Sequence, residues 1–145
     1  MTSRAGSKVS IVTVVWNGAA TLERTIQSVL AQDHPDIEYI IVDGGSTDGT
    51  LDIVRRYEGR ISRWVSEKDR GIYDAMNKGI ALCTGDWIGL INADDWYEPD
   101  TVRTVIHAAA TNPKANIVHG DIWIHYPNGS KRIKHAKPNG FLLRY

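Results

Sequence analysis

Two stretches of the chain decide its fold: Ile-Ile-Val-Asp-Gly-Gly-Ser-Thr-Asp-Gly-Thr (40–50) and Gly-Leu-Ile-Asn-Ala-Asp-Asp-Trp (89–96). Each is an apolar run that ends abruptly in acidic and small residues. Because an apolar run bounded by turn residues is typical of a strand buried on both faces, each stretch predicts a central strand. Asp43, Asp94 and Asp95 then follow the carboxyl ends of these strands, where open α/β sheets bind ligands. Carboxylates gathered at that edge favour a nucleotide held with a divalent metal.

The rest of the chain alternates strands and helices. The patterns predict strands over 9–15, 38–42, 61–66, 86–91 and 116–124, and helices over 19–31, 49–58, 71–83 and 99–110. Near the end, Tyr126-Pro127-Asn128-Gly129-Ser130 predicts a hairpin turn, with 131–135 as the returning strand. We therefore expect a single α/β domain over residues 1–145, with a mostly parallel sheet, helices on both faces and an antiparallel hairpin near the C-terminus.

The composition limits the classes of partner and compartment. Seventeen basic and seventeen acidic residues cancel, so no global field favours nucleic acid. No apolar run approaches the ~20 residues that cross a bilayer, and the polar start lacks the apolar core of a signal peptide. The single cysteine, Cys83, fits a reducing compartment. We expect a cytoplasmic protein with no nucleic-acid partner and no transmembrane segment.

Asn92, Asp94 and Asp95 fit two roles. Mg²⁺ or Mn²⁺ takes oxygen ligands, is held by one or two carboxylates, and completes its shell with phosphate oxygens and water. Acids placed just before Trp96-Tyr97-Glu98-Pro99 could equally complement the dipole of a following helix. The second acidic cluster, at the end of another predicted central strand, favours the metal.

The loop over 43–49 also has two interpretations. Asp43 directly ends a buried strand, so we expect its carboxylate to face the cleft and accept hydrogen bonds from a base or a sugar hydroxyl. Glycines such as Gly45 let the backbone approach a ligand closely. Ordinary turn chemistry would account for the same residue types. A calcium loop does not fit, because its sixth position is Asp48 rather than glycine.

Two polar segments flank the start of the helix expected over 71–83. Lys68 and Arg70 could neutralise a pyrophosphate or lie in a solvated loop. Asp74 and Asn77 share one face of the helix, and most such faces simply meet water.

Taken in order, these segments resemble the family 2 glycosyltransferases, which have the GT-A fold. The matching segments are 9–18, 22–32, 40–50, 67–80 and 84–95, so the resemblance covers about residues 9–112. The stretch Asp-Arg-Gly-Ile-Tyr-Asp-Ala-Met-Asn-Lys-Gly (69–79) is similar to transferases of bacterial surface-polysaccharide assembly.

The resemblance implies transfer of a sugar, with inversion, from a UDP- or GDP-sugar to a saccharide or lipid-linked acceptor in polysaccharide or glycolipid biosynthesis. A lipid-linked acceptor would bring the protein to the inner face of the membrane, and the oligomeric state stays open. The implied donor-binding residues are Thr13, Val15, Asn17, Asp43, Gly45, Asp69, Arg70, Asp74, Asn77, Asn92 and Asp94. The resemblance assigns the divalent metal to Asp94 and Asp95.

The sequence departs from the family pattern at two points. Family members often show Asp-x-Asp where this chain has Asn92 in the first acidic place, which leaves open which acid binds the metal. The family also takes its general base, an acid, from a later segment. Asp121 is the only acid after Asp100, and its position at a strand start gives no reason to assign it as the base. The alternatives are the donor-binding part of a longer protein, a truncated or non-catalytic nucleotide-sugar-binding module, and a chain completed by a partner.

Overall fold

The computed structural model describes residues 7–135. Its elements in chain order are β1 (Val9–Val15), α1 (Leu22–Leu30), β2 (Ile37–Asp43), α2 (Thr50–Arg56), the short 3-10 helix η2 (Glu58–Arg60), β3 (Arg63–Ser66), α3 (Ile72–Leu82), β4 (Trp87–Asn92), α4 (Thr101–Thr111), β5 (Ile122–His125) and β6 (Lys131–Lys134).

Four parallel strands form the central sheet in the order β3-β2-β1-β4. β1 lies in the middle and is buried along its whole length, as its β-branched sequence predicts. The register places Val15 beside Asp43 and Val14 beside Asn92. The ends of β1, β2 and β4 therefore meet at one edge of the sheet.

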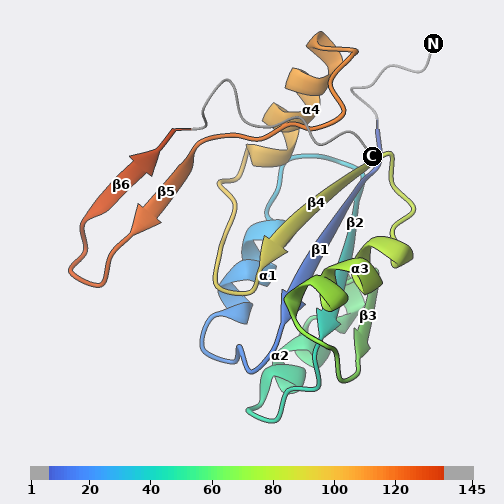
Figure 1. Cartoon of the computed structure of the whole chain (residues 1–145), viewed down its shortest axis with the longest axis vertical. Coiled ribbons are helices and arrows are strands. Elements are labelled where there is room, and N and C mark those ends of the chain that lie inside the picture. The colour runs from blue at the N-terminus through green and yellow to red at the C-terminus, as the bar shows by residue number, and fades with distance from the viewer. Residues whose placement is uncertain (1–6, 136–145) are drawn as a thin grey trace.

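Helices cover both faces of this sheet (Figure 1). α3 packs on one face over a small apolar cluster that includes Val12 and Val42. α1, α2 and α4 enclose the larger core on the other face. α3 lies unusually close to the sheet, because a Cβ atom on Gly79 would overlap the Val12 side chain. The predicted mostly parallel sheet with helices on both faces is confirmed.

β4 is buried less than its sequence predicts. Ile88 is 45% exposed and Leu90 is 43% exposed, whereas Ile91 on the opposite face is buried. The prediction that the run over 89–96 is buried on both faces is wrong for this strand. Since β4 is the outer strand of the sheet and α3 packs mainly over β1 and β2, one face of β4 stays open.

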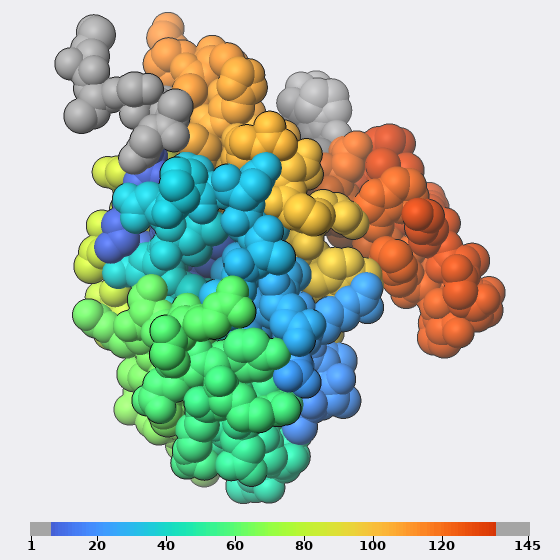
Figure 2. Space-filling model, turned by 180° about the vertical axis from the view of Figure 1, so that it is seen from behind, coloured from blue at the N-terminus to red at the C-terminus, as the bar shows by residue number. Residues whose placement is uncertain are grey.

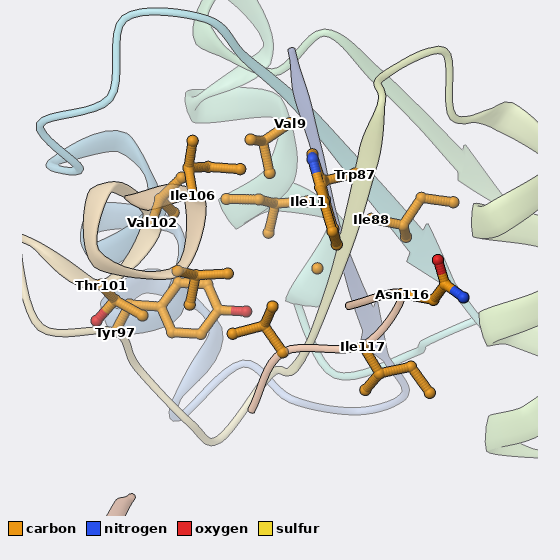
Figure 3. Close-up of a pocket in the computed structure, with 13 residues that line it drawn as sticks. Val9, Ile11, Trp87, Ile88, Tyr97, Thr101, Val102, Ile106, Asn116 and Ile117 are labelled. Atoms are coloured by element: carbon orange, nitrogen blue, oxygen red, sulfur yellow. The ribbon is translucent and has the colours of Figure 1, made fainter. Parts of the chain in front are cut away.

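The segment after α4 also differs from the prediction. We expected a strand over 116–124, but β5 covers only Ile122–His125 and pairs with β6 in a separate antiparallel hairpin. Residues 116–118 instead pass beside β4 and help to line a small cavity (Figure 3). The hairpin turn itself and its returning strand lie where they were predicted. Within residues 7–135, no helix is long and apolar enough to cross a membrane.

The amino-terminal edge of the sheet is closed by hydrogen bonds to one carboxylate. Glu38 accepts hydrogen bonds from the Ser10 hydroxyl (2.5 Å), from the Thr84 backbone N–H and hydroxyl (both 2.8 Å), and from Lys8 Nζ (3.2 Å). Burial acts to raise the pKa of Glu38, but these hydrogen bonds outweigh burial and hold the pKa at about 2. The carboxylate therefore joins the starts of β1 and β2 to the segment before β4.

Candidate functional site

A cavity of about 480 Å³ opens at the carboxyl-terminal edge of the sheet. Its walls come from the ends of β1 and β4 and from the start of α3. Five of the predicted site residues line it: Val15, Asn17, Asp69, Asn92 and Asp94. The topology therefore brings residues from three separate sequence segments to the edge where parallel α/β sheets bind ligands.

The loop after β4 supplies the acidic side of the cavity. Asp94 is exposed and lines the cavity wall. The Asp95 backbone N–H donates to the Asn92 carbonyl (3.1 Å), and the Asp95 carbonyl accepts from the Thr25 hydroxyl (2.7 Å). Burial raises the pKa of the Asp95 carboxyl, and the nearby charge of Asp94 raises it further. The two carboxylates are therefore close enough to repel each other, and a bound cation would relieve this repulsion.

Asn92 presents an unsatisfied acceptor to the same cavity. Its Oδ1 is buried and accepts no hydrogen bond from any residue between 7 and 135. A buried oxygen without a donor is costly, and such atoms in a cleft indicate a place where a ligand or an ion supplies the missing partner.

The oxygen atoms of Asn92, Asp94 and Asp95 are of the kind that bind a hard divalent cation, and they could supply part of its coordination shell. In the described part of the chain, no group of three or more His, Cys, Asp or Glu side chains could hold a metal by itself. Mg²⁺ and similar ions are commonly held by one or two carboxylates and take their remaining ligands from phosphate oxygens and water. The loop after β4 matches that arrangement, with Asp94 at the cavity and Asp95 beside it.

The wall opposite this loop is made of two loops tied together. Asn17, with the uncommon φ of 49°, follows β1 and receives its fixed position from the loop after β2. Its backbone N–H donates to the Ser46 hydroxyl (2.7 Å), and its Oδ1 accepts from the Thr47 N–H (2.9 Å). The Ala19 N–H donates to Asp48 Oδ2 (3.0 Å). These bonds hold both loops as one rigid wall, and they give Asp48 a structural role.

Asp43 lies beneath this wall and not in the cavity. Its side chain is fully buried, and its Oδ2 accepts from the Gly45 N–H (3.0 Å), the Ser46 N–H (3.0 Å) and the Ser66 hydroxyl (2.7 Å). Its Oδ1 accepts no hydrogen bond within residues 7–135. The expectation that this carboxylate faces the cleft is not met, because the turn over Gly45 folds back on it. Asp43 and Gly45 shape the loop instead of lining the cavity.

Thr13 is also placed differently from the prediction. Its side chain is completely buried, and its hydroxyl shares a hydrogen bond of 2.9 Å with the Tyr39 hydroxyl. Thr13 lies two residues before the end of β1, where alternation along the strand directs its side chain into the core. It cannot reach the cavity.

The loop before α3 contributes Asp69. Asp69 Oδ1 accepts from the Gly71 N–H (2.9 Å), which fixes the start of the helix. Its Oδ2 lies against Gly44, where an added Cβ atom would come within 2.5 Å of that oxygen. A side chain at position 44 would therefore displace the Asp69 carboxylate from the cavity wall.

The other predicted residues of this region lie outside the cavity. Arg70 is exposed, and its guanidinium lies 2.8 Å from Asp74 Oδ1. Hydrogen bonds from the Arg70 side chain and backbone hold the pKa of Asp74 below its usual range. Asn77 is exposed, and its side chain makes no hydrogen bond to any described residue. Arg70, Asp74 and Asn77 do not line the cavity.

Some cavity residues were not predicted from the sequence. Trp16 lines the cavity and is 69% exposed, and Gly18, Thr21 and Ile72 are among the other residues of the wall. The usable signal for Trp16 is its position directly after a buried strand, because a large aromatic ring left in solvent there offers a stacking surface.

A second cavity, of about 180 Å³, lies elsewhere on the sheet (Figure 3). It is enclosed by β1, β4, α4 and residues 116–118, and its lining contains no charged side chain. An apolar space of this kind does not suit a diphosphate, so the cavity beside Asp94 is the candidate site.

Comparison with known proteins defines the family. The sequence model of Glycosyl transferase family 2 matches residues 10–144, and the chain belongs to that family. A PGL/p-HBAD biosynthesis glycosyltransferase of Mycobacterium bovis (strain BCG / Pasteur 1173P2) is 37% identical over 122 residues, which cover 81% of this chain and 48% of the relative. The chain thus spans about half the length of that relative.

Solved structures agree with this assignment. The mannosyltransferase PcManGT from Pyrobaculum calidifontis, in complex with GDP-Man and Mn²⁺, has a TM-score of 0.67 and 28% identity over 72% of this chain and 32% of its own. S. aureus TarS 1-349 in complex with UDP-GlcNAc has a TM-score of 0.68 and 22% identity over 73% of this chain and 32% of its own, and it supports the fold alone. The GT-A fold and membership of Glycosyl transferase family 2 are therefore established for this chain.

Proposed function

We propose that this chain forms the donor-binding part of an inverting glycosyltransferase, which moves a sugar from a nucleoside-diphosphate sugar to an acceptor hydroxyl. The observation that carries the proposal is the cavity that joins the Asn92–Asp94 loop to the ends of β1 and the start of α3. Two structural relatives were solved with UDP-GlcNAc and with GDP-Man and Mn²⁺, which supports a donor of this class.

Each part of the cavity has a role in this proposal. Asp94 and Asp95 would hold a divalent cation, which when bound supplies positive charge to the leaving diphosphate. The rigid wall around Asn17 would fix the nucleoside, and the exposed ring of Trp16 would stack against the base. Asp69 and the backbone N–H groups at the start of α3 would orient the sugar and its phosphates.

The acceptor we propose is a saccharide or a lipid-linked saccharide in polysaccharide or glycolipid biosynthesis. Support comes from the biosynthetic glycosyltransferase that is 37% identical to the chain. Within the described residues, Asp121 directly precedes β5, its carboxylate contacts His135 (2.8 Å), and it does not line the cavity as a general base would. A nucleotide-sugar-binding module that depends on further residues for the base is the second candidate, and this placement of Asp121 favours it.

Thermal unfolding in the presence of nucleotides tests the proposal. UDP or GDP with Mn²⁺ should raise the unfolding midpoint of the chain, and EDTA should abolish most of the increase. Asp94→Asn should remove the metal-dependent part, while Asp52→Asn, a matched change on exposed α2, should leave it intact. A midpoint that no nucleotide raises would contradict the donor site. If a nucleotide does bind, an assay with the corresponding sugar donor distinguishes the two candidates. Transfer or slow hydrolysis of the bound donor indicates an enzyme, and binding without either indicates a binding module.

A further inference from the structure

The β5–β6 hairpin stands apart from the rest of the molecule. Its two strands pair only with each other, and the hairpin forms a lobe at one side of the body (Figures 1 and 2). One tie to the body is the ring contact between His125 and Trp96, whose centroids are 4.8 Å apart. Arg24 of α1 lies 3.3 Å from the centre of the Trp96 ring, on which it stacks.

This contact orients the hairpin. Side chains alternate between the two faces of a strand, so His125 and Trp123 lie on one face and their neighbours lie on the other. Because His125 contacts Trp96, its face turns toward the body. The opposite face, here called the outer face, consists of Ile122, Ile124, Arg132 and Lys134. The register pairs Ile122 with Lys134 and Ile124 with Arg132 across the two strands.

The outer face combines apolar and cationic groups in contact with solvent. Ile122 is 53% exposed, Ile124 is half-buried, and Tyr126 at the adjoining turn is 43% exposed. Arg132 and Lys134 are exposed, and neither forms an ion pair with an acid of residues 7–135. Elsewhere on the surface, cations such as Arg55 and Arg103 are paired with nearby carboxylates. The chain is neutral overall, so the outer face is a local excess of positive charge.

We propose that the outer face of this hairpin binds the surface of a membrane that contains anionic lipids. Branched apolar side chains and a tyrosine suit the interface between headgroups and acyl chains. Arg132 and Lys134 would meet the lipid phosphates while their aliphatic stems lie along the apolar layer. A protein partner would need an acidic and apolar surface of the same shape, whereas an anionic bilayer offers both properties without a specific shape.

The position of the hairpin gives membrane binding a consequence for the donor site. Trp96, which holds the hairpin, directly follows Asp95 in the loop beside the cavity. A hairpin lying on a membrane would therefore hold the cavity near the lipid surface. At that position, a lipid-linked acceptor in the membrane would lie close to the bound donor, a consequence that rests on the proposed function. Membrane binding by the outer face is itself independent of any transfer reaction.

Co-sedimentation with vesicles tests the proposal. The chain should bind vesicles of equimolar phosphatidylcholine and phosphatidylglycerol, should bind phosphatidylcholine alone weakly, and should dissociate in high salt. Each basic residue at an anionic surface is worth roughly fivefold in partitioning, and reversal of the charge does at least as much. Arg132→Glu combined with Lys134→Glu should therefore lower vesicle binding by about 25-fold or more. Arg55→Glu combined with Arg56→Glu makes the same change of charge on α2 and should have little effect.

Several results would overturn the proposal. They are the absence of binding to anionic vesicles, equal losses for the two double variants, and binding to heparin or RNA without binding to vesicles. The unfolding midpoint of each variant checks that it folds. If the glutamate pair unfolds the hairpin, then Arg132→Gln with Lys134→Gln replaces it and must still weaken binding. The nucleotide-induced rise of the midpoint should be unchanged in the outer-face variants, so this proposal and the donor site can fail separately.

Discussion

The two edges of the central sheet differ in how completely their polar groups are hydrogen-bonded. At the amino-terminal edge, Glu38 receives hydrogen bonds from three different residues, and its pKa is held at about 2. At the carboxyl-terminal edge, Asp43 Oδ1 and Asn92 Oδ1 are buried without a donor among residues 7–135, and the pKa of Asp95 is raised. The same strands therefore end in a saturated network on one side and in unsatisfied acceptors on the other, where Asn92 lines the cavity and Asp43 lies beneath its wall. We infer that the first edge stabilises the fold and that the second is arranged for a ligand.

The largest expected effect comes from removing the acidic pair. Asp94→Ala combined with Asp95→Ala should weaken binding of UDP or GDP in the presence of Mn²⁺ by about 100-fold, because the cation loses its protein ligands. Calorimetric titration measures the affinity. Asp52→Ala, an exposed acid on α2, serves as the control. Affinity that is unchanged in the double variant would remove the metal from this edge.

The matching change at the amino-terminal edge should act on stability alone. Glu38→Gln should lower the free energy of unfolding by roughly 2–3 kcal/mol, because hydrogen bonds to a charged acceptor are lost and Lys8 loses its ion-pair partner. Denaturant unfolding measures this loss, while nucleotide affinity should stay as in the unchanged chain. A parallel fall in nucleotide affinity would show that the two edges are not independent.

The contribution of Glu38 to stability should depend on pH, because the pKa of its carboxyl is depressed in the folded chain. Glu38 titrates at about 2 in the folded chain against 4.5 ordinarily. Its contribution to stability should therefore be complete above pH 4.5 and should disappear as the pH falls toward 2. Unfolding curves of the chain and of Glu38→Gln should converge in this interval. Curves that stay equally far apart in acid would contradict the ionised network.

The smallest expected effect is a gain in the free energy of unfolding, whereas Glu38→Gln lowers it. Although Asp95 is largely exposed, its partial burial and the charge of Asp94 raise the pKa of its carboxyl, so the folded chain disfavours its charged form. The stability contributed by this group is present below its ordinary pKa of 3.8 and is lost as the pH rises through the folded value. Asp95→Asn should therefore stabilise the chain at neutral pH, by less than about 1 kcal/mol because the side chain is exposed and screened. The gain in stability should vanish in acid, and destabilisation by Asp95→Asn at neutral pH would contradict the repulsion between the two carboxylates.

Local patterns were enough to place most of the fold. The β-branched run over 9–15 gave the bounds of β1, and the helical spacing over 71–83 gave α3 within one residue at each end. The segment over 116–124 was misjudged, because apolar residues show that a strand can form but not what it pairs with. The exposure of Ile88 and Leu90 was missed for a related reason, since the position of a strand in the sheet is a tertiary property.

The candidate site was predicted less completely than the fold. Topology alone brings Val15, Asn17, Asn92 and Asp94 together, because each lies at or just after a strand end. The inward turn of Asp43 depends on three hydrogen bonds from residues 45, 46 and 66, and no local pattern specifies them. The ion pair of Arg70 with Asp74 likewise kept a predicted phosphate ligand in solvent.

Paramagnetic broadening of backbone amide signals by Mn²⁺ in the presence of UDP or GDP tests the contrast between the two edges most directly. We expect loss of the signals of Asn17, Gly71 and Asp94 around the cavity, and retention of those of Ser10, Glu38 and Thr84 at the opposite edge. EDTA should restore the lost signals. Broadening centred on the amino-terminal edge, or no selective broadening at all, would contradict the assignment of the metal and the diphosphate to the carboxyl-terminal edge.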